Sequence, residues 1–456
     1  MQTPLRLYPH PLETIEGAGQ ALRAGRTTCA AILEHCFQQI DRWDDQVHAW
    51  VFIDRAAAML QARALDAELA QGQCRGPLHG IPFGIKDIID VQGMPTACGF
   101  APWRNQIAEQ DAKLVTALRQ SGAVILGKTV TTQFAWIDPP ITRNPWNLDR
   151  TPGGSSSGSA VAVATGMCLA ALGSQTGGSI IRPASFCGIS GYKPSYHTLN
   201  EDGIFPLAPS FDHPGFLART IDDIRLIESI PLPHVLLDDL QIPAPSPSQV
   251  DPWVKGLLSP RSSPPRLLRP RGFFDRRAET DTLNALDQAV AILEADGAKV
   301  LEFPDPLDFE AILGSHRLMM SAEAAALHET RFSELRSHYS KHIAKLIEEG
   351  LQIKVTDYIR SSQQWNNSLK WLDGILLTPA TVGPAPDAST TGNPCMNSPF
   401  SYLGWPTITF PIGLSPDALP LGIQMSMDPG RNEEDLLQTA SWCQSVIQRA
   451  ANAGSA

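Results

Sequence analysis

Two clusters of glycine and serine could carry hydroxyl chemistry, and the first is the denser one. Residues 151–159 read Thr-Pro-Gly-Gly-Ser-Ser-Ser-Gly-Ser. Taken alone, such a run is typical of a flexible linker. Here it lies between the stretches 134–136 and 160–172, both rich in apolar residues. A flexible linker buried between them would leave backbone polar groups without partners. We therefore interpret this cluster as part of a functional site.

The second cluster, residues 173–184, combines paired glycines with another serine. Gly177 and Gly178 would let backbone N–H groups approach a ligand atom closely. A helix that starts near Pro183 would point its positive end at the same place. These are the parts of an oxyanion hole, with Ser179 beside it. The segment is equally compatible with a strand-to-helix turn in which Ser179 only caps the helix.

The third candidate is Lys86, which lies in the apolar segment 81–88. Burial disfavours the charged form of a lysine and would lower its pKa toward that of a useful base. The alternative is a lysine on an edge strand that extends its amine into water. A serine hydroxyl needs a base before it becomes a good nucleophile, and Ser–Lys arrangements provide one without histidine. Neither cluster contains a histidine, and no Gly-x-Ser-x-Gly motif followed by Asp and His is evident.

The elements that must position these residues alternate between helix and strand. Apolar spacing predicts an N-terminal helical layer, then a strand–helix–strand series, and further helices and strands after a Pro- and Ser-rich region. The predicted helices are 13–22, 28–43, 55–69, 111–121, 280–296 and 358–372, and the predicted strands are 81–88, 123–128, 299–303, 374–378, 403–412 and 421–425. This order predicts an α/β fold in which helices cover a large parallel or mixed sheet.

One domain over residues 1–456 explains this pattern better than three separate units. Within it we expect four parts, which are an N-terminal helical layer, a catalytic core, a linker-like surface loop and a C-terminal α/β part that completes the sheet. Their ranges are 1–72, 76–220, 231–270 and 271–456.

Composition excludes several classes of function. A formal net charge of −11 argues against non-specific binding to nucleic acid, which depends on Lys and Arg at phosphates. No apolar run reaches the roughly 20 residues of a membrane span, and the start of the chain lacks the features of a signal peptide. The eight cysteines are scattered without the spacing of a zinc site or a disulfide scaffold. We expect a cytoplasmic protein with no membrane partner, no nucleic-acid partner and no metal or organic cofactor.

Taken together, these segments resemble the amidase-signature family. The matching motifs are Gly-Ile-Pro-Phe-Gly-Ile-Lys-Asp at 80–87, Gly-Gly-Ser-Ser at 153–156, Thr-Gly-Gly-Ser at 176–179, Phe-Cys-Gly at 186–188 and Gly-Tyr-Lys-Pro at 191–194. Agreement resumes at 376–425, and it is poor between 231 and 372. The resemblance implies the amidase-signature fold, a large mixed sheet covered by helices on both faces.

The resemblance also implies a set of catalytic roles. Ser179 would be the nucleophile that forms an acyl-enzyme, Ser155 the proton relay and Lys86 the base. Like the corresponding family bond, the peptide bond before Ser155 would be cis. Backbone N–H groups of Thr176, Gly177, Gly178 and Ser179 would form the oxyanion hole. The expected activity is hydrolysis of a linear carboxamide with release of ammonia or an amine.

Arg182 narrows the substrate. The Ser-x-x-Arg-Pro-Ala pattern that starts at Ser179 resembles the malonamidase-like and carboxybiuret-hydrolase-like branch, in which this arginine binds a substrate carboxylate. A planar guanidinium suits bidentate binding of a carboxylate. The alternative is a structural ion pair that holds the start of a helix. The sequence leaves both interpretations open, so the predicted substrate is a small linear amide with or without a carboxylate.

Three rival functions are less compatible with the sequence. The A subunit of glutamyl-tRNA amidotransferase has the same triad, but the position of Arg182 and the presence of Gln175, where that branch often has an aspartate, argue against it. A membrane-associated lipid amide hydrolase would need an apolar patch or span, which the polar N-terminus lacks. A catalytically dead scaffold is incompatible with an intact triad. The family resemblance also implies a homodimer.

Overall fold

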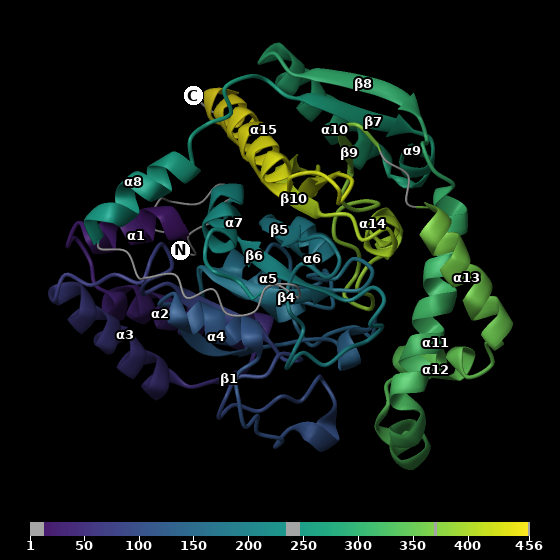
Figure 1. Cartoon of the computed structure of the whole chain (residues 1–456), viewed down its shortest axis with the longest axis horizontal. Coiled ribbons are helices and arrows are strands. Elements are labelled where there is room, and N and C mark those ends of the chain that lie inside the picture. Colours follow the sequence, from purple (N-terminus) through teal and green to yellow (C-terminus); the bar gives the residue numbers. More distant parts are fainter. Residues whose placement is uncertain (1–12, 234–246, 369–371, 455–456) are drawn as a thin grey trace.

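The structure, a computed structural model, describes residues 13–233, 247–368 and 372–454 (Figure 1). Within these ranges one eleven-stranded mixed sheet runs through the molecule in the order β1-β3-β2-β4-β6-β5-β10-β11-β9-β7-β8. The strands are β1 Trp50–Ile53, β2 Pro82–Lys86, β3 Val124–Thr129, β4 Ala170–Gln175, β5 Ser190–Lys193, β6 His213–Ala218, β7 Arg266–Arg271, β8 Lys299–Pro304, β9 Ile375–Pro379, β10 Thr407–Leu414 and β11 Pro420–Ser426. The predicted α/β class is confirmed.

Helices cover this sheet along its length (Figure 1). The helices of the described residues are α1 Ile15–Arg23, α2 Cys29–Val47, α3 Arg55–Ala70, α4 Lys113–Gln120, α5 Ser157–Ala164, α6 Ile181–Cys187, α7 Ile221–Glu228, α8 Pro247–Leu257, α9 Phe273–Arg277, α10 Thr280–Ala295, α11 Phe309–Leu335, α12 Lys341–Gly350, α13 Val355–Ser368, α14 Ser398–Tyr402 and α15 Glu433–Gly454.

The central strands are parallel where they position the site. Strand β2 pairs in parallel with both β3 and β4, and the five residues of β2 are all buried. A parallel strand covered on both faces is expected to be a continuous apolar run, and Lys86 is the exception at its end. Beyond β4 the sheet becomes antiparallel through β6, β5, β10 and β11. Because β2 and β4 run in the same direction, their carboxyl ends lie side by side. Lys86, the last residue of β2, is therefore close to the end of β4.

The N-terminal helices form as predicted, and polar caps define where they begin. The hydroxyl of Thr28 accepts a hydrogen bond from the N–H of Ala31, which places the start of α2 at the expected residue. Thr14 and Asp54 cap α1 and α3 in the same way. The apolar faces of α2 and α3 join α5 in a buried cluster on one side of the sheet. This layer supports the segment that leads into α5.

Helices α11, α12 and α13 pack against one another at one side of the molecule, at the right of Figure 1. Asp138, far away in the sequence, joins them to the core, because its carboxylate accepts hydrogen bonds from the N–H groups of His342 and Ile343 at the start of α12. The long helix α11 reaches the second Gly/Ser cluster, where His316 contacts Thr176. The region of poor family resemblance therefore supplies one wall of the site.

The surface loop that we predicted over 231–270 is wrong in part. Residues 234–246 lie outside the described residues, but Pro247–Leu257 form α8 and Arg266–Arg271 form β7. Val250 and Val254 of α8 are buried, and Leu267 and Leu268 of β7 lie in the core beside β8 and β9. Because the region is rich in proline and serine, we predicted a loop although α8 and β7 each contain a short apolar pattern. In the described part of the chain, none of the helices is both long and apolar enough to cross a membrane.

Close approach of α5 to the N-terminal layer gives the first prediction. A Cβ at Gly158 would lie 2.2 Å from the carbonyl oxygen of Ala49 and 2.4 Å from the backbone nitrogen of Val130. Both are main-chain atoms that must shift to make room. We expect Gly158→Ala to lower the free energy of unfolding by roughly 1–3 kcal/mol in urea denaturation.

The matched control is Gly256→Ala in α8, because a Cβ there meets no atom within 4 Å. Alanine is the better helix former by up to about 1 kcal/mol, so this variant should be as stable as the wild type or slightly more so. Equal stability of the two variants would contradict the steric argument.

Candidate active site

Three segments meet at the amine of Lys86. This residue ends β2, and its Nζ lies 2.7 Å from Ser155 Oγ, 2.8 Å from Ser174 Oγ and 3.3 Å from the carbonyl oxygen of Ser174. Ser155 comes from the loop before α5, and Ser174 from β4. The structure therefore brings together the predicted base and the predicted relay serine, which are 69 residues apart.

Burial controls the charge of this amine. Lys86 and Ser155 have no exposed surface. Removal from water lowers the pKa of Lys86 to about 7, although the nearby carboxylate of Asp212 acts in the opposite direction. A neutral amine has two N–H donors and one lone pair. It can donate to Ser174 and accept a hydrogen bond from the Ser155 hydroxyl, which is the arrangement a base requires. The alternative of an edge-strand lysine that extends into water is wrong.

The loop that carries Ser155 is held in place from two sides. The hydroxyl of Ser156 donates a hydrogen bond to the carbonyl of Ser174 and accepts one from the N–H of Ser174. The N–H of Ser156 donates to the carbonyl of Ser179 at 3.2 Å. As the resemblance implied, the Gly154–Ser155 peptide bond is cis. Both Gly/Ser clusters therefore form one hydrogen-bonded unit, which excludes the flexible-linker interpretation of the first.

Three successive carbonyl groups of the second cluster already accept hydrogen bonds. Thr176 O accepts from His316 Nε2 at 2.9 Å, Gly177 O accepts from Ser401 Oγ at 2.8 Å, and Gly178 O accepts from the N–H of Arg182 at 3.0 Å. In a trans peptide the N–H points opposite to the carbonyl. The N–H groups of residues 177, 178 and 179 therefore point away from these three donors. Among the described residues, none of these N–H groups has an acceptor. Such a group of N–H donors suits an oxyanion.

Ser179 does not cap the helix that follows it. Helix α6 begins at Ile181, two residues before the predicted Pro183. The N–H groups of Ile180 and Ile181 both donate to Gln175 Oε1, at 2.9 and 3.0 Å. Gln175 thus performs the capping function with a neutral amide, and the capping interpretation of Ser179 is wrong.

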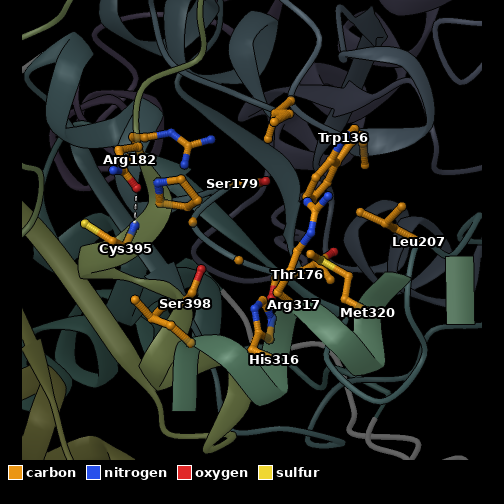
Figure 2. A pocket seen from close by; sticks show the side chains of 17 residues that line it. Trp136, Thr176, Ser179, Arg182, Leu207, His316, Arg317, Met320, Cys395 and Ser398 are labelled. Carbon is orange, nitrogen blue, oxygen red and sulfur yellow. Dashed lines mark hydrogen bonds between the residues drawn. The ribbon is translucent and has the colours of Figure 1, made fainter. Parts of the chain in front are cut away.

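A pocket of about 270 Å³ opens at Ser179 (Figure 2). It is lined by Ala135, Trp136, Ile137, Thr176, Gly177, Gly178, Ser179, Arg182, Leu207, Leu313, His316, Arg317, Met320, Asn393, Pro394, Cys395 and Ser398. In Figure 2, Arg182 lies on one side of Ser179, and Trp136, Leu207 and Met320 lie on the other. Ser155 and Lys86 are not in this lining and lie beneath the surface. A substrate in the pocket would reach Ser179 before it reached the relay or the base.

Arg182 is buried but incompletely hydrogen-bonded. One terminal nitrogen donates to the carbonyl of Gly154 at 2.7 Å and to Thr391 Oγ1 at 3.3 Å. The other terminal nitrogen and Nε have no partner, and the residue is only 1% exposed. Burial lowers the pKa of Arg182 to about 10, so the side chain remains charged at neutral pH. No carboxylate forms an ion pair with it in the described part of the chain, which argues against the structural ion pair.

Sequence reasoning missed several residues of the site. Ser174 belongs to the second cluster, but its contact with Lys86 depends on the pairing of β2 with β4. Asp212 accepts a hydrogen bond from the hydroxyl of Thr176 and two more from the N–H groups of Leu207 and Ala208. Burial raises the pKa of Asp212 to about 6. His316 lies in the poorly matching region, where no sequence signal was available.

Comparison with known proteins identifies the family. The family described as Amidase matches residues 31–437. The A subunit of glutamyl-tRNA(Gln) amidotransferase from Desulforudis audaxviator (strain MP104C) is 38% identical over 315 residues, which cover 67% of this chain and 62% of that protein. Its counterpart from Chlamydia trachomatis serovar D is 30% identical over 455 residues, or 89% of each chain. The chain belongs to the amidase family. In four of the curated relatives, the region that matches this chain covers only 60–64% of the relative's own length.

Solved structures share the whole fold. A structure described as a crystal structure of amidase superimposes with a TM-score of 0.82 at 30% identity and covers 95% of this chain and 99% of its own. A protein complex linked to the origins of an s-triazine catabolic enzyme gives a TM-score of 0.83 at 27% identity, with 95% and 98% covered. A peptide amidase bound to chymostatin gives 0.79 at 25% identity, with 95% and 97% covered. These similarities confirm the amidase-signature fold and a family of enzymes that act on carbon–nitrogen bonds.

The lowered pKa of Lys86 predicts a pH dependence. If the neutral amine is the active form, activity is lost as the pH falls through the pKa and is retained above it. We expect kcat/KM for a neutral amide to rise with an apparent pKa of about 7 and then level off. The carboxylate of Asp212 favours the charged form of the Lys86 amine and so raises its pKa. Asp212→Asn removes this negative charge and should move the apparent pKa of kcat/KM to lower pH. A pH–rate profile with no inflection between about pH 6 and 8 would contradict the assignment.

Proposed function

We propose that this protein is an amidohydrolase that cleaves the carbon–nitrogen bond of a small linear amide through an acyl-enzyme on Ser179. The observation that carries the proposal is the buried hydrogen bond between Lys86 Nζ and Ser155 Oγ at 2.7 Å. A charged lysine in that position would be of no use to a hydroxyl, whereas a neutral one with a pKa of about 7 can remove its proton. The pocket at Ser179 supplies a place for the amide carbonyl.

The proposed reaction passes a proton along three groups. Lys86 takes the proton of Ser155, and Ser155 takes the proton of Ser179 as the Ser179 hydroxyl oxygen attacks the amide carbon. The N–H groups of the 176–179 loop stabilise the negative charge on the carbonyl oxygen. When the carbon–nitrogen bond breaks, Ser155 gives a proton to the leaving nitrogen and takes one back from Lys86. Water then hydrolyses the ester on Ser179 with the same groups acting in reverse order.

Arg182 supports a substrate that carries a carboxylate. Arg182 lines the pocket, and its guanidinium remains charged and has two buried nitrogens without a partner. An unmatched buried charge is costly, and a substrate carboxylate would compensate it. Arg182 also donates to the carbonyl that precedes Ser155. The same residue would thus bind the substrate and hold the relay loop.

The second candidate is a glutaminase component like the proteins named among the relatives. Two curated A subunits of glutamyl-tRNA(Gln) amidotransferase match 89% and 91% of this chain. Glutamine carries an ammonium group, which would require an acidic or carbonyl-rich partner. Among the described residues that line the pocket, two are arginines and none is Asp or Glu. We therefore favour an anionic amide over zwitterionic glutamine.

Replacement of the nucleophile gives the third prediction. Ser179→Ala should lower kcat/KM for ammonia release from small amides by at least about 10³-fold, because the acyl-enzyme can no longer form. Ser185→Ala is the matched control, since it removes a buried hydroxyl without a partner from the same helix region. It should keep activity near that of the wild type. Full activity in Ser179→Ala would rule out the acyl-enzyme proposal.

The selectivity of Arg182→Gln gives the fourth prediction. The measured quantity is the ratio of kcat/KM for an amide with a carboxylate to kcat/KM for its neutral isostere. Any disturbance of Ser155 affects both substrates and cancels in the ratio. We expect the ratio to fall about 30- to 1,000-fold, as for loss of one partner of a buried charge pair. Arg360→Gln, which alters an exposed arginine on α13, should leave the ratio unchanged.

Ammonia release by the purified chain separates the two candidates. Turnover of carboxylated amides without tRNA, ATP or other proteins supports a stand-alone amidohydrolase. Turnover of glutamine only, or only after another protein is added, would favour the amidotransferase component.

A further inference from the structure

The side of the pocket away from Arg182 is an apolar wall. It consists of Trp136, Leu207 and Met320, which all line the pocket. Figure 2 shows Trp136, Leu207 and Met320 together, across Ser179 from Arg182. Met320 comes from α11, whereas Trp136 and Leu207 come from loops of the catalytic core. Two parts of the chain that are far apart in sequence thus build one surface, which we call the apolar wall.

The polar groups beside this wall are already satisfied or neutral. Arg317 lies with its guanidinium carbon 5.0 Å from the centre of the Trp136 ring and forms an ion pair with Glu349 of α12. The imidazole of His316 is hydrogen-bonded to Thr176 O, and burial lowers its pKa to about 4, so it is neutral. Neither side chain offers an unmatched charge to a ligand. The wall therefore favours contact with an apolar group over contact with a charged one.

We propose that the apolar wall is a subsite for a hydrocarbon substituent, so that the substrate is an amide with a carboxylate at one end and an aliphatic or aromatic group at the other. This inference rests on the proposed function, because it takes the carboxylate to lie at Arg182. Leu207 and Met320 are only 2% and 3% exposed, and Trp136 is 8% exposed. Their positions are fixed by the core, so the subsite exists before the ligand arrives. The pocket of about 270 Å³ limits the ligand to a small molecule.

A series of straight-chain monocarboxylates from acetate to octanoate tests the subsite directly. Binding is measured by calorimetry on Ser179→Ala, which does not turn over and separates binding from catalysis. Each methylene that the wall buries should tighten binding roughly three- to fourfold. We expect the dissociation constant to fall steadily with chain length and to level off once the pocket is filled.

Variants of the wall identify the contact. In the Ser179→Ala background, Met320→Gln should reduce the gain per methylene and leave acetate unchanged. Trp136→Gln, at the most exposed residue of the wall (8%), should have the same effect and covers the case in which the Met320 variant does not fold. Leu327→Gln is the matched control, because Leu327 is an exposed apolar residue two turns further along α11 and does not line the pocket. It should leave the whole series unchanged.

The results separate this inference from the proposed function. Affinity that does not depend on chain length, or that depends on it equally in all variants, would overturn the apolar subsite. Arg182→Gln should weaken every carboxylate, acetate included. If it does not, the carboxylate assignment fails even where the dependence on chain length persists.

Discussion

A lysine amine without access to water is the constraint on which the rest of the site depends. Lys86 ends a strand that is buried on both faces, so a charged amine there would lack the solvation it needs. Its pKa falls to about 7, and Ser155 and Ser174 take the place of water. The sheet supplies this environment, because β3 and β4 flank the strand in parallel. The proposed base chemistry is thus a consequence of where the chain places one side chain.

The two Gly/Ser clusters share their hydrogen bonds, and this makes them one site. Ser156 joins the first cluster to both Ser174 and Ser179, and Arg182 returns from the second cluster to Gly154. His316 and Ser401, from the C-terminal half, hold two carbonyls of the second cluster. The loop is therefore fixed by contacts from three parts of the chain. Such support preorganises N–H donors, which is what stabilisation of a developing oxyanion requires.

Much of the fold could be predicted from local pattern, whereas the pocket could not. Strand 81–88, helix 280–296 and the N-terminal helices have clear apolar periodicity and lie close to where we expected them. The proximity of Lys86 to Ser155 was expected only through the family resemblance, because no local rule joins residues 69 positions apart. Met320 and the rest of the apolar wall depend on how α11 packs against the core. That packing is a long-range contact for which the sequence has no motif.

The most direct measurement is the titration of Lys86 itself. Protein labelled with ¹³C at lysine Cε is followed by NMR from about pH 5 to 11, and the Lys86 resonance is assigned by its absence in Lys86→Met. The comparison is needed because burial also lowers the pKa of Lys193 to about 7. A midpoint near 7 for Lys86 is the result that a neutral, buried base predicts. A midpoint near the ordinary lysine value of about 10.4 would mean that the amine is charged at neutral pH, and it would contradict the proposed mechanism.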